Sequence, residues 1–353
     1  MEITKHIIIY SKDNSMNGVI SKYYKMSCVT KEINYNIYVR KGKEIKEKQS
    51  SNFKIIRYNS KLIFFRYYPL LRRIRKEDLN IIRYTGADFS LLFMLPRKKK
   101  LFWELHTNYI LELGKAGFLV KLFELTLGRL ILKHARGILA TSNSIYDVNK
   151  KTYHYKCRKH LLLNSFITSD VTFYQKKDTI INEKYILIMA SSFSFWHDLT
   201  SLEKLISTID IKLVILGNSM LKSSNPRILN YGYVSDSREL DSLISNALLC
   251  IDSVGFDSLK LEETSSLKLF KYLEHGARVV IFKKLPFKDE FLTSKYIFQL
   301  GDINELINLL NDLAPLPIED QQELKLYMHT NYSLKKIIKS EIEYLYNENY
   351  RQN

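Results

Sequence analysis

The chain has 353 residues, a length that suits two domains, and its 46% hydrophobic and 26% charged residues exclude wholesale disorder. Its longest apolar runs, such as Leu91–Leu95, fall far short of the about 18–20 residues of a membrane-spanning helix, which excludes an integral membrane protein. The net charge is +17, and the first 100 residues carry 23 Lys and Arg against 8 Asp and Glu. This asymmetry predicts an anionic partner for the first part of the chain: nucleic acid, an anionic membrane surface or a lipid diphosphate. The alternative is a solvated basic face without a partner.

The first half of the chain alternates short runs rich in Ile, Val, Tyr and Phe with helical stretches. The runs predict strands at His6–Tyr10, Tyr35–Arg40, Phe53–Tyr58, Leu79–Tyr84, Leu101–Leu105 and Gly137–Ala140. Apolar spacing predicts helices over Asn17–Glu32 and Tyr109–His134, and Thr141–Ser144 is typical of a helix start. The apolar side of the second helix is expected to hold Leu113, Leu119, Leu122, Phe123, Leu130 and Ile131. This alternation predicts a parallel sheet covered by helices on both faces.

The same alternation begins again after a polar segment, Thr168–Glu183, which we interpret as a linker. Strands are predicted at Tyr185–Ala190, Lys212–Leu216, Ile228–Gly232, Leu248–Ile251 and Arg278–Phe282. Helices are predicted over 198–208, Ser237–Ser245, Ser266–His275 and Ser333–Tyr346. The sequence therefore predicts an α/β chain of two doubly wound, Rossmann-like domains, residues 1–167 and 168–330, facing a central cleft. The final helix, in residues 331–353, is expected to pack back towards the first domain.

Cysteine usage and missing motifs narrow the function classes. Cys28, Cys157 and Cys250 are far apart and odd in number, so we expect neither a disulfide framework nor a zinc cluster, which favours the reducing cytosol. The chain has no G-x-G-x-x-G after a strand, no Walker loop, no H-E-x-x-H and no Asp-x-Asp pair. These absences disfavour a dinucleotide oxidoreductase, a P-loop NTPase and a zinc protease. No cofactor and no metal are expected.

The most informative segment runs from Ile251 to Val280 and predicts a strand, a loop, a helix ended by glycine, and a second strand. The loop delivers Ser265 and Ser266 to the helix start, where free N–H groups and the helix dipole favour an anion. Lys268 lies in the first turn and adds a full charge, and Glu263, just upstream, could accept hydrogen bonds from sugar or ribose hydroxyls. The alternative interpretation is a plain capped helix with one solvated lysine.

This segment resembles the nucleotide-sugar signature of the family-four retaining glycosyltransferases of GT-B fold, in their bacterial surface-polysaccharide branch. That branch commonly has Ser-Pro-Leu-Lys, two variable residues and then Glu-Tyr-Leu-x-x-Gly. The matching residues here are Ser265-Ser266-Leu267-Lys268, Tyr272-Leu273 and Gly276. The resemblance implies catalytic roles for Lys268 and Glu263, and donor binding by Glu263, Ser265, Ser266, Leu267 and Lys268. The family's Glu-x7-Glu pair falls on Glu263 and Lys271, so its second carboxylate is missing, and Glu274 lies one turn later.

A second match covers Ala190–Leu199, where a subset of the family has Trp-His-Gly in place of the basic residues that hold the donor diphosphate. It implies that Ser191 and Ser192 bind the donor and that His197 takes the place of the phosphate-binding lysine. A protonated His197 would serve this role best, and a dianion beside it would favour protonation. The alternative is that His197 is a structural cap.

A third match covers Leu101–Asn108, which resembles the segment that faces the acceptor and the donor sugar in these enzymes. It implies catalytic roles for Glu104 and His106. The alternative for Glu104 is a hydrogen bond that ends a strand. All three matches lie within residues 79–345, the stretch over which the chain resembles the family.

The resemblance implies a retaining, metal-independent glycosyltransferase that uses a UDP- or GDP-linked sugar. Its expected acceptor is a lipid-diphosphate-linked glycan or polysaccharide of O-antigen, capsule or other surface glycan synthesis. Because the basic first domain and the helix over Tyr109–His134 suit anionic lipid, we expect a cytoplasmic protein, peripheral on the inner face of the cytoplasmic membrane. Two alternatives stay open: a sugar-nucleotide 2-epimerase of similar fold, and a basic nucleic-acid-binding protein. The second has no recognised motif, so nucleic acid is not an expected partner.

Overall fold

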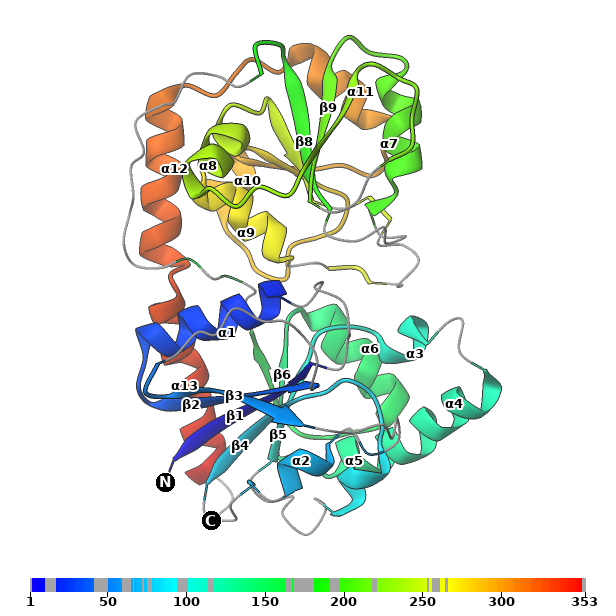
Figure 1. Ribbon diagram of the computed structural model, residues 1–353, viewed down its shortest axis with the longest axis vertical. Coiled ribbons are helices and arrows are strands. Elements are labelled where there is room, and N and C mark those ends of the chain that lie inside the picture. The colour runs from blue at the N-terminus through cyan, green and yellow to red at the C-terminus, as the bar shows by residue number, and fades with distance from the viewer. Residues whose placement is uncertain are drawn as a thin grey trace. The chain divides into compact units, whose positions relative to one another are not determined.

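In the computed structural model the chain divides into two units (Figure 1). The first unit comprises Met1–Leu163 and Leu334–Asn353, and the second unit comprises Asn164–Ser333. These limits lie close to the predicted domain limits at residues 167 and 331. The structure describes residues 2–9, 17–40, 50–58, 65, 67–71, 73–74, 78–93, 101–113, 117–162, 165, 167, 181–190, 197–217, 221–252, 254–255, 261–263 and 266–350.

The first unit is built on a parallel sheet with the strand order β3-β2-β1-β4-β5-β6-β7. The strands are β1 (Ile3–Ile9), β2 (Ile33–Arg40), β3 (Phe53–Tyr58), β4 (Leu79–Arg83), β5 (Leu101–Leu105), β6 (Gly137–Ala140) and β7 (Lys159–Leu161). The helices are α1 (Asn17–Val29), α2 (Tyr68–Leu71), α3 (Tyr109–Glu112), α4 (Phe118–Phe123), the π-helical segment η4 (Glu124–Gly128), α5 (Arg129–Lys133), α6 (Asn143–Tyr153) and α13 (Leu334–Tyr350). Large side chains fill its core: Trp103 packs edge-on against Tyr67 and Tyr84.

The second unit is built on a parallel sheet with the strand order β10-β9-β8-β11-β12-β13. The strands are β8 (Tyr185–Met189), β9 (Lys212–Leu216), β10 (Ile228–Gly232), β11 (Leu249–Ile251), β12 (Val279–Ile281) and β13 (Ile297–Gln299). The helices are α7 (Leu199–Ile206), α8 (Ser237–Ser245), α9 (Leu267–Glu274), α10 (Glu290–Lys295), α11 (Glu305–Asp312) and α12 (Ile318–Asn331). Aliphatic side chains of the central strands, such as Ile186, Ile215 and Ile251, form its core with α7 and α11.

Both strand orders are those of doubly wound sheets, and helices lie on both sides of each sheet (Figure 1). The predicted α/β fold of two Rossmann-like domains is therefore confirmed. In such a sheet the order in which successive strands are added reverses beside the first strand, and this place is called the switch point. Ligands bind at the carboxyl ends of the strands on either side of it. The switch point lies between β1 and β4 in the first unit and between β8 and β11 in the second.

The prediction of one helix over Tyr109–His134 is wrong. Helix α3 ends at Glu112, a new helix starts after Gly117, and it passes through the π-helical turn before α5. Of the predicted apolar side, Leu119, Leu122 and Leu130 are exposed. Within 118–133 the buried residues are Glu124, Leu127, Gly128, Ile131 and Leu132. Among the described residues, no helix combines the length and the apolar character needed to cross a membrane.

Candidate active site

The first turn of α9 is attached to the ends of two neighbouring strands at the switch point of the second unit. Ser266 begins the helix, because its Oγ accepts a hydrogen bond from the amide of Leu269 at 3.0 Å. The same hydroxyl donates to the carboxylate of Asp252, the residue that follows β11. The hydroxyl of Tyr272 accepts a hydrogen bond from the amide of Met189, at the end of β8, at 2.7 Å. The helix start is therefore held in place beside both strand ends.

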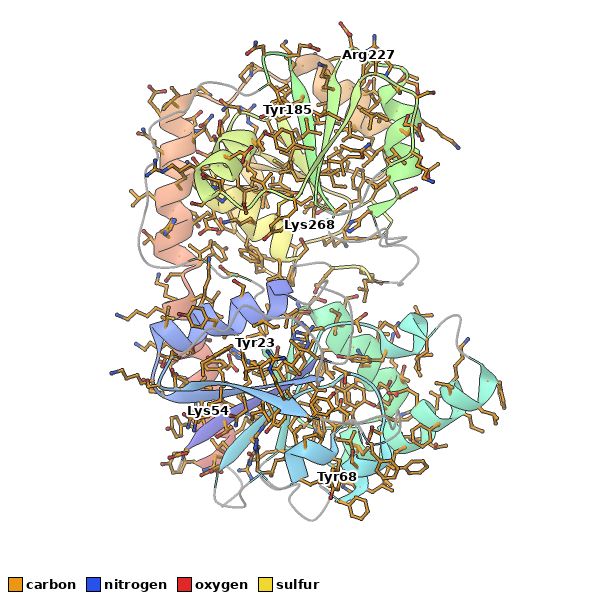
Figure 2. The ribbon with its side chains drawn as sticks, in the orientation of Figure 1. Tyr23, Lys54, Tyr68, Tyr185, Arg227 and Lys268 are labelled. Atoms are coloured by element: carbon orange, nitrogen blue, oxygen red, sulfur yellow. The ribbon has the colours of Figure 1, made fainter. Side chains whose placement is uncertain are left out.

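Lys268 lies at this helix start (Figure 2). Its ammonium group donates to the backbone carbonyl of Asp252 and lies 3.2 Å from Nδ1 of His197. Burial lowers the pKa of Lys268 to about 8. Burial and the charge of Lys268 together lower the pKa of His197 to about 3. His197 is therefore a neutral imidazole at physiological pH, and the imidazolium expected from the sequence would need a further anion beside it.

The tautomer of His197 follows from its contact with Lys268. Because Nδ1 faces an ammonium donor, we assign the imidazole proton to Nε2, which makes Nε2–H a donor. The next residue, Asp198, has a left-handed backbone (φ 43°) and occupies the glycine position of the Trp-His-Gly pattern that this segment resembles. Its carboxylate accepts a hydrogen bond from the amide of Ser201 at the start of α7. Aspartate tolerates this conformation better than most residues, so the turn that carries His197 is kept without glycine.

Asp252 is fully buried, and burial raises its pKa. Its Oδ2 has no hydrogen-bond partner among the described residues. Asp252 directly follows a buried strand, but its local sequence pattern indicates no role for it. The structure shows that Asp252 receives the Ser266 hydroxyl on its carboxylate and the Lys268 ammonium on its carbonyl, so it positions both groups at the helix start. The helix amides and the ammonium group of Lys268 at this helix start are groups that favour an anion.

The other predicted residues of the second unit are placed as follows. Glu263 is half-buried and forms a backbone bridge with Lys284, beyond the end of β12, so it too lies at the carboxyl edge of the sheet. Leu267 is the first residue of α9. Lys271 lies 3.1 Å from Oε2 of Glu274, so the carboxylate one turn beyond the missing family glutamate is paired with that lysine. Three predicted residues lie outside the described residues: Ser191, Ser192 and Ser265.

The end of α9 is held by a second buried group. Nδ1 of His275 lies 2.6 Å from Oδ1 of Asp241 on α8, and Lys325 of α12 lies 3.1 Å from the same oxygen. Gly276 then ends the helix with a left-handed backbone (φ 77°), and a Cβ there would meet the carbonyl of Gln321 at 2.9 Å. These contacts fix α9 at both ends, so the position of Lys268 is set by the fold.

In the first unit, buried charged side chains surround Glu104, the penultimate residue of β5. Oε2 of Glu104 lies 2.6 Å from Nζ of Lys5 on β1, while Oε1 contacts the hydroxyl of Tyr23 on α1 and Nε2 of His106. Lys5 also lies 2.8 Å from Oε1 of Glu341 on α13. Burial opposes both charges, but their attraction outweighs it: the pKa of Glu104 is held well below its usual value, and that of Lys5 is raised.

His106 directly follows β5, and its side chain is 15% exposed. Burial and the charge of Arg83 lower the pKa of His106 to about 3, so the imidazole is neutral. Because Glu104 is ionised, Nε2 of His106 carries the proton that Glu104 accepts, and Nδ1 is left as an acceptor. The pair is a carboxylate that fixes the tautomer of an imidazole, and this imidazole can accept a hydrogen bond from a hydroxyl group.

Sequence reasoning missed Lys5, Tyr23, Arg83 and Glu341 as neighbours of Glu104. The signal for Lys5 was a lone cation within the apolar strand Ile3–Ile9. No local signal existed for Glu341, which reaches the group from the other end of the chain, on a helix that packs against α1. Across the described ranges, no three His, Cys, Asp or Glu side chains gather as metal ligands.

A scan against protein-family models finds no match, and a search of curated proteins finds none either. Solved structures do match over the whole chain. Sucrose-phosphate synthase from Thermosynechococcus elongatus superposes with a TM-score of 0.67 at 12% identity, covering 100% of both chains. Anabaena HepE, in complex with UDP and glucose, gives 0.62 at 10%, covering 98% of this chain and 100% of that one. WaaG, a glycosyltransferase involved in lipopolysaccharide biosynthesis, gives 0.63 at 11%, covering 96% and 99%. The likeness shows that this chain has the GT-B fold.

Proposed function

We propose that this protein is a glycosyltransferase that moves a sugar from a nucleoside diphosphate to a hydroxyl group of an acceptor glycan. The observation that carries the proposal is the start of α9, where Lys268 and the helix amides lie beside His197 at the switch point. A diphosphate is the anion that these groups suit. The fold likeness to HepE, which holds UDP and glucose, and to WaaG supports a nucleotide-sugar donor.

The proposed reaction retains the configuration of the sugar and uses no metal. The bond between the anomeric carbon and the β-phosphate oxygen breaks, and a bond from the acceptor oxygen forms on the same face. The departing phosphate oxygen takes the proton of the acceptor hydroxyl, which balances the step. Charge that develops on the phosphate is stabilised by Lys268 and by the amides after Ser266, groups that are already in position.

The remaining residues bind hydroxyl groups in this proposal. Glu263 accepts hydrogen bonds from the ribose or the donor sugar. His106, with its tautomer fixed by Glu104, accepts one from a sugar hydroxyl through Nδ1. No paired carboxylates of the glycosidase type are needed, because the phosphate itself removes the proton.

The proposed acceptor is a lipid-diphosphate-linked glycan or polysaccharide of bacterial surface glycan synthesis. The protein would meet it at the cytoplasmic face of the inner membrane, as a peripheral protein. The support is the excess of Lys and Arg in the first 100 residues, which favours an anionic surface.

Thermal shift with UDP-, GDP-, ADP- and CMP-sugars tests the donor site. We expect stabilisation by one nucleotide class, loss of that shift in Lys268→Ala, and no loss in Lys204→Ala, which removes an exposed lysine of α7. Transfer to an added acceptor then tests the reaction. Conversion of the free sugar nucleotide without acceptor would instead indicate an epimerase. Retention on heparin without any sugar-nucleotide shift would reject the proposal in favour of nucleic-acid binding.

A further inference from the structure

The helical stretch 118–133, made of α4, η4 and α5, carries apolar residues on two faces. One face is buried and includes Leu127, Ile131 and Leu132. The other is exposed and follows helical spacing through Phe118, Leu119, Leu122 and Leu125. Phe118 is 75% and Leu119 76% exposed, and no residue of α4 is buried. Helix α4 extends away from the sheet of the first unit (Figure 1).

The buried face is anchored, so the exposed face cannot turn inward. The carboxylate of Glu124 accepts hydrogen bonds from the hydroxyls of Tyr84 at 2.5 Å and Tyr153 at 2.7 Å, and from the amide of Ala87 at 2.5 Å. Gly128 approaches the same group so closely that a Cβ would meet the Tyr84 hydroxyl at 2.6 Å. The exposed apolar side chains are therefore a fixed feature of the surface, since a rotation of the helix would break these contacts.

An aromatic residue from another segment extends this surface. The ring of Phe89 packs edge-on against Phe123, with 4.8 Å between centroids, and Phe89 is itself exposed. We call Phe89, Phe118, Leu119, Leu122 and Leu125 the docking face. Exposed apolar side chains that gather in this way mark interaction surfaces.

Within the stretch 118–133, the charged side chains other than the buried Glu124 have one sign. The charged residues of 118–133 are Lys121, Arg129 and Lys133, together with Glu124, whose carboxylate is buried and hydrogen-bonded. Arg129 and Lys133 are exposed. A partner that suits this surface has an apolar interior beneath an anionic outer layer. A bilayer of anionic lipid has both, because its acyl chains lie beneath charged headgroups.

We propose that the docking face inserts into the boundary between headgroups and acyl chains of an anionic membrane, with Arg129 and Lys133 on the headgroups. This inference rests on the proposed function, because a lipid-linked acceptor requires the protein to reach the membrane. Charge attraction alone would hold the protein at the lipid surface. Insertion of Phe118 and Leu119 adds an apolar contribution that high salt does not remove.

Co-sedimentation of the full chain with vesicles tests the proposal, using phosphatidylcholine alone and phosphatidylcholine with phosphatidylglycerol. We expect binding to the anionic vesicles, and about tenfold weaker binding for the double variant Phe118→Ser, Leu119→Ser. The matched control, Tyr233→Ser with Leu326→Ser, changes side chains of the second unit that are 76% and 54% exposed and should bind as the parent does. Equal binding by the docking-face variant and the parent would overturn the proposal.

Two further measurements distinguish membrane insertion from dimerisation and from a failure of the proposed transferase function. Sedimentation velocity without lipid would reveal a dimer, and a dimer that the docking-face variant abolishes would assign the face to a second copy and overturn membrane insertion. The thermal shift with the sugar nucleotide should be unchanged in the docking-face variant. Vesicle binding without any nucleotide shift would reject the proposed transferase while leaving the docking face supported.

Discussion

Two buried lysines, one in each unit, have opposite electrostatic surroundings. Lys5 lies between the carboxylates of Glu104 and Glu341, at 2.6 and 2.8 Å, and their attraction outweighs burial and raises its pKa. Lys268 donates to a backbone carbonyl and faces a neutral imidazole, and burial lowers its pKa to about 8. The fold thus stabilises the charge of one lysine and disfavours the charge of the other.

The difference indicates what each lysine does. The charge of Lys5 is compensated inside the protein, so Lys5 serves the fold and the orientation of Glu104. At Lys268 burial outweighs the attraction of Asp252, so its ammonium form is disfavoured, and a bound diphosphate would stabilise it further. The proposed catalytic role belongs to the lysine with the lowered pKa, and the structural role to the lysine with the raised pKa.

Replacing each lysine by methionine tests this contrast most directly. Lys5→Met is expected to lower the free energy of unfolding by about 3–5 kcal/mol, because two buried carboxylates lose the cation between them. Lys268→Met should leave that free energy nearly unchanged, since burial already disfavours its ammonium form. Chemical denaturation measures both variants. Similar losses in the two would refute the comparison.

Catalysis should show the reverse order. Lys268→Ala is expected to lower kcat/KM by about 10²–10³, because the variant loses a cation at the departing phosphate. Lys204→Ala on α7 serves as the control and should turn over as the parent does. Steady-state kinetics with the donor found by thermal shift provides the measurement. Unaltered turnover in a folded Lys268→Ala protein would remove this residue from the site.

The Glu104–His106 pair should give a smaller effect. Glu104→Gln is expected to lower kcat by about 10–10², because the amide no longer fixes the imidazole tautomer. Tyr23→Phe removes another donor to the same oxygen but leaves the carboxylate, so its loss should be smaller. Rates are compared well below the melting temperature of every variant. If Tyr23→Phe and Glu104→Gln lose activity equally, the tautomer is not the cause.

The pH dependence of UDP binding should give the smallest effect. With a pKa of about 8, Lys268 loses its proton above pH 8, so the affinity for UDP should fall by up to about tenfold per pH unit there. Lys268→Arg stays charged and should bind UDP with little change up to pH 10. Titration calorimetry measures both profiles. A falling affinity above pH 8 in the arginine variant as well would assign the pH dependence to another group.

His197 refines the same experiment. Its pKa of about 3 means that the residue binds as a neutral donor. His197→Ala should therefore weaken UDP binding by a similar factor at pH 6 and at pH 8. A loss much larger at pH 6 would show that the diphosphate protonates His197, as the sequence suggested.

Several features of the site were predictable because they are local. Ser266 and Lys268 follow a buried strand at the spacing of a helix cap, and the structure places them there. The strand Tyr185–Met189 is a continuous apolar run, and Leu101–Leu105 is apolar apart from Glu104, which is typical of buried parallel strands. By contrast, β7 and β13 are three residues long and lie at sheet edges, so they gave no periodic signal.

The failure over Tyr109–His134 has a different cause. Its apolar residues lie on two faces of the helical stretch, and their spacing alone does not predict which face is buried. The choice is made by Glu124, a charged residue that is buried because Tyr84, Tyr153 and Ala87 supply three donors to its carboxylate. Those donors come from segments distant in the chain, so no window of the sequence contains the information.

The sequence by itself determined the alternation of strands and helices, and with it the doubly wound fold and the edge of each sheet where polar residues follow the strands. Only the tertiary structure decided the protonation states that the chemistry depends on. Lys5 and Lys268 are identical as residues. Their pKa values differ because the charges of two carboxylates outweigh burial at Lys5, whereas burial outweighs the charge of Asp252 at Lys268. Burial and the position of neighbouring charges set a pKa, and both arise only when distant segments pack together.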